Sequence, residues 1–420
     1  MDARLSQMPI IDIDTHYTEP ADLWTSRAPS RFKDKVLEVR SDARGVESWY
    51  IGDVYVAPLG FCVIASDKGK RRGILTLPTM DEMSMARSEA AARLEVMDSF
   101  GISAALLYPN VVGFGSQRLM EISDDPELRL FLVQAYNDAI AQLQREGGGR
   151  LYPQAVLPLW NIDACLKELR RCREILGLTG IVMSDSPEHF GQPNLADPAW
   201  APFWSTCEDL GLPINFHIGS GSTDKVEGYW AADGMQYSGP DRDPYAVCYA
   251  SANMFLMNFR GMMNLILTGM LERYPKLKFV SVESGVGWVP FLLQSIEYTI
   301  KELLTPEERR ARFKRSPHEQ FTQQIFTSYW FENANNVDSY LREFGAENLM
   351  FETDFPHPQC LYPDVREKVS ETLGHHSADI QRKVLYENAA HLYGIELTSN
   401  GSTDEARPVI AGRAVNSEAT

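Results

Sequence analysis

Short apolar segments rich in β-branched residues alternate with longer amphipathic stretches along most of the chain. Several of the longer stretches carry apolar residues three and four positions apart, which is the spacing of one helix face. A strand followed by a helix, repeated eight times, predicts a (β/α)8 TIM-type barrel. A doubly wound open sheet is the alternative, although no G-x-G-x-x-G motif follows the first apolar segment. The eight predicted strands are residues 9–14, 103–109, 152–159, 180–184, 212–218, 278–284, 324–330 and 348–354.

Two segments interrupt this repeat. Residues 30–82 separate the first strand from its helix and contain short strand-like pieces, and residues 218–250 follow the fifth strand. Both insertions are expected at the C-terminal mouth of the barrel, where such loops shape substrate specificity. We therefore predict one barrel over residues 1–396. The polar, Gly- and Ser-containing residues 397–420 are predicted to form a flexible tail or an arm that docks on a neighbour.

Charge and composition exclude several classes of protein. The 420 residues include 40 Lys and Arg against 57 Asp and Glu, a net charge of −17, with no basic block of the kind that nucleic-acid binding requires. No run approaches the roughly 20 apolar residues that span a bilayer, and the first residues do not resemble a signal peptide. The six cysteines are scattered without a C-x-x-C pair. These features predict a cytoplasmic protein with reduced thiols that binds neither nucleic acid nor membranes.

Acids and histidines fall at the ends of the predicted strands. Asp12, Asp14 and His16 alternate along the first strand, so their side chains share one side of it. His217 ends the fifth strand, and Asp354 ends the eighth. Buried acids are unfavourable unless they are paired or bound to a cation. Any one of these residues alone could be an ordinary hydrogen-bonded or surface group. Four strand-end groups together (Asp14, His16, His217 and Asp354) favour a divalent metal site at the mouth.

The order of the motifs resembles a known family. The motifs are DIDTHYTEP at 12–20, NFHIG at 215–219, ESGVGWVP at 283–290, ETDFPHP at 352–358 and ENAAHLYG at 387–394. Together they resemble the amidohydrolase-related branch of the metal-dependent hydrolase superfamily that includes aminocarboxymuconate semialdehyde decarboxylase. The same branch includes resorcylate- and carboxyvanillate-type decarboxylases and some ring-fission-product hydrolases. The resemblance covers about residues 9–396.

The resemblance implies particular roles for individual residues. It assigns Asp14 and His16 as the strand-one ligands, with His217 and Asp354 as the further metal ligands. Because the fourth strand has no lysine to bridge two ions, one metal per chain is expected. Zn²⁺ is the first choice, and Mn²⁺ is the alternative because Asp14 replaces a more usual histidine. The family also implies a homodimer or a larger even oligomer.

Other residues are candidates for catalysis or substrate binding. Glu283 replaces a histidine that is frequent in the branch; it is interpreted as an acid/base, an extra ligand or a structural residue. His357 is a candidate catalytic group or a loop-capping histidine. Arg260, with Arg71 and Arg72, is a candidate clamp for a substrate carboxylate, although surface solvation is the commoner role of an arginine. The aromatic residues Trp288, Trp330 and Phe331 are interpreted as a pocket wall or as core.

The remaining histidines lie away from the strand ends. We expect His391 to pack in a helix, and His189, His318, His375 and His376 to face solvent.

Three functions follow from these residues, and the first is favoured. It is a metal-dependent decarboxylase of a small carboxylated aromatic or ring-derived compound, in which Asp354 or Glu283 protonates the ring carbon before CO₂ leaves. The alternative is a metal-dependent hydrolase, in which the metal and Asp354 activate water and Glu283 or His357 protonates the leaving group. The third is a non-catalytic metal-binding barrel. The ligands alone do not choose between the two enzymes.

Overall fold

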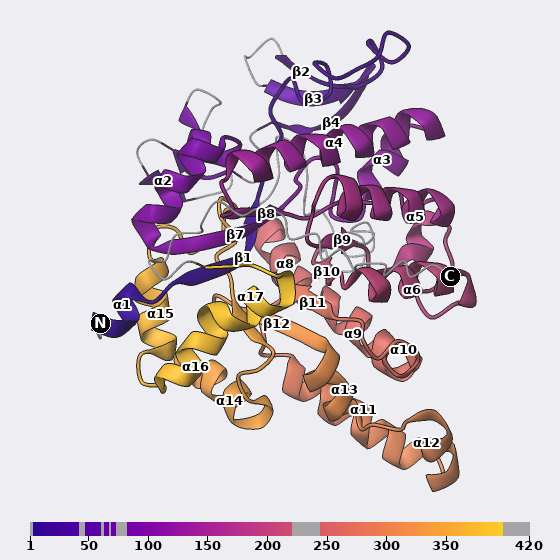
Figure 1. Ribbon diagram of the computed structural model, residues 1–420, viewed down its shortest axis with the longest axis vertical. Coiled ribbons are helices and arrows are strands. Elements are labelled where there is room, and N and C mark those ends of the chain that lie inside the picture. The colour runs from indigo at the N-terminus through magenta and orange to yellow at the C-terminus, as the bar shows by residue number, and fades with distance from the viewer. Residues whose placement is uncertain are drawn as a thin grey trace, which may run out of the picture.

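The computed structural model describes residues 3–41, 47–59, 63–66, 69–72, 82–220 and 244–397 (Figure 1). Its centre is an eight-stranded parallel sheet. A bridge between Ala155 and Ile181 joins the first and last strands of the sheet order, so the sheet closes into a barrel. The strands are β1 Ile10–His16, β7 Ile102–Tyr108, β8 Leu151–Pro153, β9 Ile181–Met183, β10 Ile214–His217, β11 Phe279–Val282, β12 Ile325–Tyr329 and β13 Leu349–Phe351.

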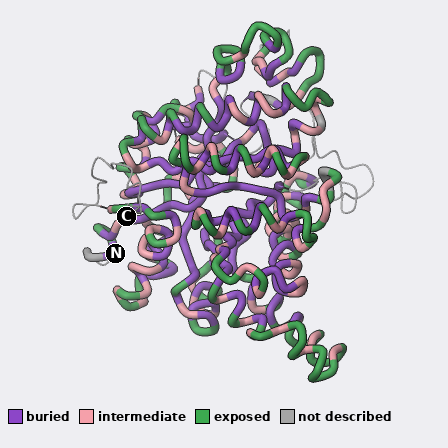
Figure 2. The backbone as a smooth tube through the Cα atoms, turned by 45° about the vertical axis from the view of Figure 1, so that its right-hand side comes forward, coloured by how far each residue is buried: buried purple, intermediate pink, exposed green. Residues whose placement is uncertain are grey.

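The eight predicted strands and the (β/α)8 fold are confirmed. Every residue of β1 and of β7 is buried. Strands of a parallel barrel are covered on both faces, which is why they read as continuous apolar runs. In Figure 2 the central strands are buried, and exposure is confined largely to the outer helices. The first helices are α1 Ala3–Gln7, α2 Ala90–Phe100, α3 Gln117–Ile122, α4 Pro126–Glu146, α5 Ile162–Arg170, α6 Ala201–Leu210, α8 Pro244–Met254 and α9 Met257–Leu267. They are followed by α10 Met270–Arg273, α11 Val289–Leu303, α12 Pro306–Arg312, α13 Pro317–Gln324, α14 Ala334–Phe344, α15 Val365–Leu373, α16 Ala378–Arg382 and α17 Asn388–Tyr393.

The first insertion contains the small β structure that its sequence suggests. Strands β2 Leu37–Ser41, β3 Glu47–Ile51 and β4 Val54–Pro58 form an antiparallel sheet, and β5 Ala65–Ser66 pairs with β6 Gly69–Lys70. Trp49 of this sheet packs edge-on against Trp24, whose indole Nε1 donates to the Leu132 carbonyl of α4 at 3.0 Å. The backbone N–H of Ile64 donates to Pro356 O at 3.0 Å, which places the β5–β6 region against the loop that follows β13.

Helix α17 packs against β1 and β13 of the barrel. Tyr393 of α17 is buried and donates its hydroxyl to Asn215 Oδ1 at 2.5 Å. Asn215 in turn donates to Gln154 Oε1 at 2.9 Å. His391, on the same helix, is exposed, so the prediction that its side chain takes part in helix packing was wrong.

Other predictions lie partly or wholly outside the described residues. Residues 221–243 of the second insertion and 398–420 of the tail are not described. None of the helices in the described part of the chain combines the length and apolarity that a membrane crossing requires. The five cysteines within the described ranges are unpaired.

Candidate metal centre

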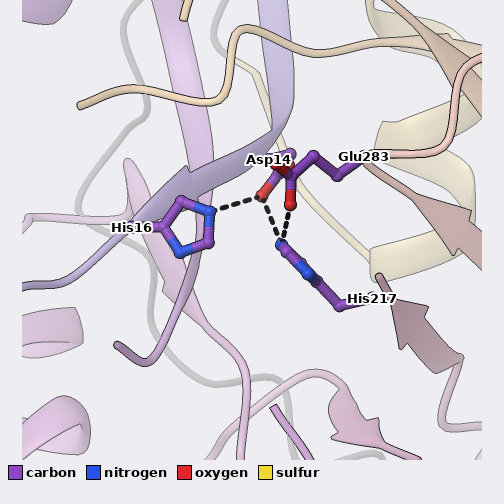
Figure 3. Close-up of side chains that lie close together, drawn as sticks. All are labelled: Asp14, His16, His217 and Glu283. Atoms are coloured by element: carbon purple, nitrogen blue, oxygen red, sulfur yellow. Dashed lines mark ion pairs between the residues drawn. The ribbon is translucent and has the colours of Figure 1, made fainter. Parts of the chain in front are cut away.

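Side chains from three strands meet at the mouth of the barrel (Figure 3). Asp14 and His16 come from β1, His217 from the end of β10, and Glu283 from the residue after β11. Asp14 Oδ1 lies 3.5 Å from His16 Nε2 and 3.5 Å from His217 Nε2, and Glu283 Oε2 lies 3.3 Å from His217 Nε2. One potential ligand atom from each residue lies within 4.8 Å of the others, so the four form a group that could hold a metal ion.

Asp354 and His357, from the loop after β13, extend this group. Asp354 Oδ1 lies 3.2 Å from His16 Nε2 and 2.9 Å from His357 Nδ1. His16, Glu283, Asp354 and His357 form a second set of converging ligand atoms that overlaps the first. The structure therefore brings together the four predicted ligands and the three predicted catalytic residues.

The converging atoms lack hydrogen-bond partners. Both oxygens of Asp14, both oxygens of Asp354, and Nε2 of His16 and of His217 are buried without one. Bonds of about 2.1 Å to one ion separate neighbouring ligand atoms by about 3.0 to 3.4 Å. The contacts of 3.2 to 3.5 Å between His16, His217 and the carboxylates match that spacing. The donor set, carboxylates with imidazoles, therefore fits a divalent metal ion.

Each candidate ligand histidine is oriented through its other nitrogen. His16 Nδ1 lies 3.4 Å from Pro109 O, and His217 Nδ1 lies 2.7 Å from Ile218 O. A ring N–H held by a carbonyl leaves the opposite nitrogen as the lone-pair donor, which is the arrangement of metal-binding histidines. Phe114 stacks on the His217 ring with centroids 3.8 Å apart, and His357 stacks on the His16 ring at 3.5 Å. The two rings are therefore fixed from their faces as well.

Two acids and two histidines of the site have shifted pKa values, and burial acts on each of them. Burial raises the pKa of Glu283 to about 8, although His217 opposes the shift. Burial, with the charges of Glu283 and Asp14, raises the pKa of Asp354 well above its usual value. The pKa of His16 is lowered by burial and by neighbouring His357 and His217, which keeps the imidazole neutral. For His217, burial alone would lower the pKa, but Asp14 and Glu283 outweigh it and raise the pKa.

The two candidate acids, Glu283 and Asp354, have an unusual backbone conformation. Glu283 has φ 61° and Asp354 has φ 60°, the left-handed region that non-glycine residues rarely adopt. Glu283 N–H donates to Glu352 Oε2 at 3.2 Å, and Asp354 N–H donates to Asp14 O at 2.9 Å. Strained backbone of this kind is retained where the surrounding structure fixes it, commonly at functional sites.

Sequence reasoning missed three residues of this site. Asn110 follows β7 and lies with Oδ1 2.9 Å from His357 Nε2. Phe114 lies four residues further and stacks on His217. Glu352 is buried and accepts from Ser328 Oγ at 2.5 Å as well as from the Glu283 N–H. Glu352 directly follows β13 and Asn110 lies two residues after β7, so the rule that found Asp354 could also have found them.

The predicted substrate-binding residues have contacts outside the candidate ligand group. Arg260 is exposed on α9, where its charge partly opposes the burial that raises the pKa of Asp185 to about 6. Trp288 is buried, donates to Ser284 O at 3.1 Å and packs edge-on against Phe259. Trp330 is 1% exposed and packs in an aromatic cluster with Phe255 and Phe331. These contacts give both tryptophans a packing role.

The other candidate arginines and the remaining histidines have local partners. Arg71 Nη2 lies 2.5 Å from Glu82 Oε1. His318 is half-buried and stacks on Phe344, so it does not simply face solvent. His375 is exposed and His376 half-buried, and both contact Asp338. The side chain of His189 lies outside the described part of the chain.

Comparison with known proteins decides the family. A family model described as "Amidohydrolase" matches residues 11–395. The chain belongs to the amidohydrolase family. This amidohydrolase is 28% identical over 270 residues to a γ-resorcylate decarboxylase of Rhizobium sp., an alignment that covers 63% of the chain and 76% of the relative. The family predicted from the motifs is thus confirmed.

Solved structures share the fold. An amidohydrolase of Mycobacterium avium subsp. paratuberculosis matches with a TM-score of 0.70 and 22% identity, over 92% of this chain and 98% of that one. A dihydroxybenzoic acid decarboxylase of Polaromonas sp., with bound manganese and the inhibitor 2-nitroresorcinol, matches with a TM-score of 0.57 and 17% identity. That match covers 94% of this chain and 99% of the Polaromonas chain. Both likenesses concern the barrel as a whole.

Proposed function

We propose that this amidohydrolase is a metal-dependent decarboxylase of small aromatic or ring-derived carboxylates. The observation that carries the proposal is the placement of a buried acid, Glu283, beside the ligand group. Glu283 Oε2 lies 3.3 Å from His217 Nε2, and burial raises the Glu283 pKa to about 8. Decarboxylation of a ring requires a proton donor at the ring carbon, and an acid that keeps its proton at neutral pH is suited to that step. The similarity to γ-resorcylate decarboxylase supports the same reaction.

Asp14, His16, His217 and Asp354 would hold the metal. When bound, the ion would act as a Lewis acid toward the substrate carboxylate and a neighbouring oxygen. Glu283 would give its proton from a carboxyl oxygen to the ring carbon. Its position is fixed by the Glu352 contact to its own backbone N–H at 3.2 Å. The closed, buried surroundings of Glu283 exclude water that would otherwise compete for the proton.

His357 and Asn110 would control a second proton. Asn110 Nδ2 donates to Thr18 Oγ1 at 3.0 Å, which turns Asn110 Oδ1 toward His357 Nε2. With Nε2–H donating to Asn110, His357 Nδ1 faces Asp354 Oδ1 at 2.9 Å, a distance over which a proton would pass between the two groups. This pair would pass to Glu283 the proton that it loses in each turnover and would then take a proton from solvent, so that one solvent proton is consumed for each CO₂ released.

Aromatic side chains favour a flat substrate. Phe114 lies parallel to the His217 ring. Phe255, Trp330 and Phe331 form a cluster, and Phe331 lies over Gly285, where an added Cβ would meet its ring at 2.9 Å. Phe331 is 47% exposed, so part of this cluster is available to a ligand. We keep Trp330 as a substrate-binding residue through this cluster, and Arg260 and Trp288 as further candidates.

Isotope labelling tests the reaction. Metal-loaded protein is incubated with 2,6-dihydroxybenzoate and a panel of other hydroxylated benzoates in D₂O. We expect release of CO₂ and one deuterium at the ring carbon that carried the carboxylate. Conversion with labelled oxygen from H₂¹⁸O in the product, and no CO₂, would contradict the decarboxylase. Binding of these compounds without any conversion would instead support a non-catalytic barrel.

The hydrolase alternative rests on the Asp354–His357 pair. A carboxylate 2.9 Å from an imidazole that a third residue orients is also the arrangement that activates a water molecule. In that reaction Asp354 would take the proton of the water and His357 or Glu283 would protonate the leaving group. The same H₂¹⁸O experiment detects this outcome directly.

The proposal also covers the metal ion, the domain organisation, the assembly and the cellular location. We propose one metal ion at the mouth of each barrel, zinc first and manganese as the alternative; the Polaromonas decarboxylase holds manganese. The single barrel over 1–396, the docking tail 397–420, a homodimeric or larger even assembly and a cytoplasmic location remain proposals of the same kind. Elemental analysis and light scattering of purified protein would test the metal and the assembly.

A further inference from the structure

A second cluster of ligand-type side chains lies on the outer ring of helices. Asp338 belongs to the second turn of α14, and His375 and His376 form the turn between α15 and α16. His375 Nε2 lies 2.9 Å and His376 Nε2 2.7 Å from the same oxygen, Asp338 Oδ1. The three ligand atoms lie within 4.8 Å of one another. None of these residues belongs to the mouth of the barrel.

Both imidazole Nε2 atoms face the same oxygen, Asp338 Oδ1, and the two rings lie 4.2 Å apart. A neutral imidazole with its proton on Nε2 donates to this oxygen, whereas one with its proton on Nδ1 presents an Nε2 lone pair there instead. In that second tautomer one divalent ion can bind both nitrogens and the oxygen together. Its ligand atoms would be about 3.3 Å apart in a tetrahedral zinc site, a small outward rotation from the present contacts.

The backbone that carries the histidines is firmly held. His376 N–H donates to Leu373 O at 3.0 Å. Gln381 is fully buried, and its side-chain amide donates to Leu373 O at 2.9 Å and to His376 O at 3.1 Å. Ser377 caps α16 by accepting from the Ile380 N–H. Ligands on a fixed turn and on a helix lose little freedom on binding an ion, which favours affinity.

The cluster is also accessible. The side chain of His375 is 51% exposed, that of Asp338 33% and that of His376 16%. An ion can therefore enter from solvent and keep water at its open position.

We propose that Asp338, His375 and His376 form a second, peripheral zinc site. Two imidazoles and one carboxylate are a common zinc ligand set, with the fourth position left to water. The ion would join α14 to the α15–α16 turn. It would stabilise the folded protein without contributing to the chemistry at the mouth.

Zinc stoichiometry tests this site separately from the mouth. Untagged, metal-loaded protein is titrated with Zn²⁺ against a chromophoric zinc chelator, together with the variants His375→Ala and Asp338→Asn. His391→Ala is the matched control, since it removes an exposed histidine from another outer helix. We expect wild type and His391→Ala to bind about one more zinc per chain than the two cluster variants. Equal zinc content in wild type and His375→Ala would overturn the proposal.

Two further measurements make the result independent of folding and of the proposed reaction. Zinc should raise the unfolding midpoint of wild type and His391→Ala, and leave that of His375→Ala unchanged, because only a bound ion stabilises the native state. In His217→Ala the peripheral zinc should persist, whether or not the decarboxylase proposal holds. Loss of both zinc ions in His217→Ala would count against a separate site, and so would an equal rise of the midpoint in His375→Ala.

Discussion

Glu168 on α5 and Asp14 on β1 are both buried carboxylates, yet their surroundings are opposite. Glu168 accepts from Asn137 Nδ2 at 2.7 Å and from Arg171 through two N–H groups at 2.7 and 2.9 Å. Burial alone would raise the Glu168 pKa, but Arg171 and Asn137 outweigh it and hold the pKa below its usual value. Neither oxygen of Asp14 has a hydrogen-bond partner, and burial raises its pKa.

The difference separates an acid that the protein itself pairs from one that the proposed metal ion would pair. Glu168 has its charge neutralised by the protein, so folding is complete without a ligand. Asp14, Asp354 and the two proposed ligand histidines leave buried polar atoms facing one another, an arrangement that is unfavourable until a cation enters. Burial by itself therefore does not identify a site; buried acids whose own hydrogen bonds are missing do.

The largest expected effect comes from removing a ligand. In His217→Ala we expect activity to fall about a thousandfold or more, because the Lewis acid is lost. The metal content measured by elemental analysis should fall with it. His391→Ala should keep both the activity and the metal. Unchanged metal content in His217→Ala would refute the role of His217 as a ligand.

The same substitution at two buried glutamates sharpens the comparison. Glu283→Gln should retain metal and fold but lose turnover by about 10² to 10⁴, since the amide cannot donate a proton at neutral pH. Glu168→Gln is the matched control, and its activity per folded molecule should be that of wild type. Recovery of Glu283→Gln by excess metal would mark Glu283 as a ligand. Full activity with reduced stability would mark it as structural.

Glu168→Gln, the variant expected to keep its activity, should be the one that loses stability. Glu168→Gln should lower the free energy of unfolding by about 1 to 3 kcal/mol, because Arg171 loses a charged partner. Because the Glu168 pKa is lowered by folding, its contribution is present above the unfolded pKa and disappears as pH falls through the folded value. Urea titrations of wild type and variant should therefore converge at acid pH. A constant difference at all pH values would point to packing instead of charge.

The smallest effect concerns the pH dependence of the metal-free protein. Folding raises the Glu283 pKa from 4.5 to about 8, so its contribution to stability is complete below 4.5 and is lost as pH rises to about 8. His16 and His357, whose pKa values are lowered, oppose this trend only below their usual 6.5. Between about pH 6.5 and 8 the metal-free protein should lose stability as pH rises. Thermal unfolding should show this slope in wild type and a flatter one in Glu283→Gln.

The sequence by itself determined the eight strands, their order and the acids and histidines at their ends. Those features are local, because they depend on residues that are close together in the sequence. A run of apolar residues predicts a buried parallel strand, and the alternation along the first strand turns Asp14 and His16 to the same side. The order of the motifs also predicted the family, and the family model that matches residues 11–395 confirms it.

Only the tertiary structure decided which groups meet and which are left without partners. The structure alone shows the left-handed backbone at Glu283 and Asp354. It also brings distant segments together, in the Asn110–His357 contact and in the Asp338–His375–His376 cluster. The packing roles of Trp288 and Trp330 and the exposure of His391 were decided in the same way. The physical reason is that hydrogen bonding and burial depend on neighbours across the fold, whereas periodicity reports only neighbours along the chain.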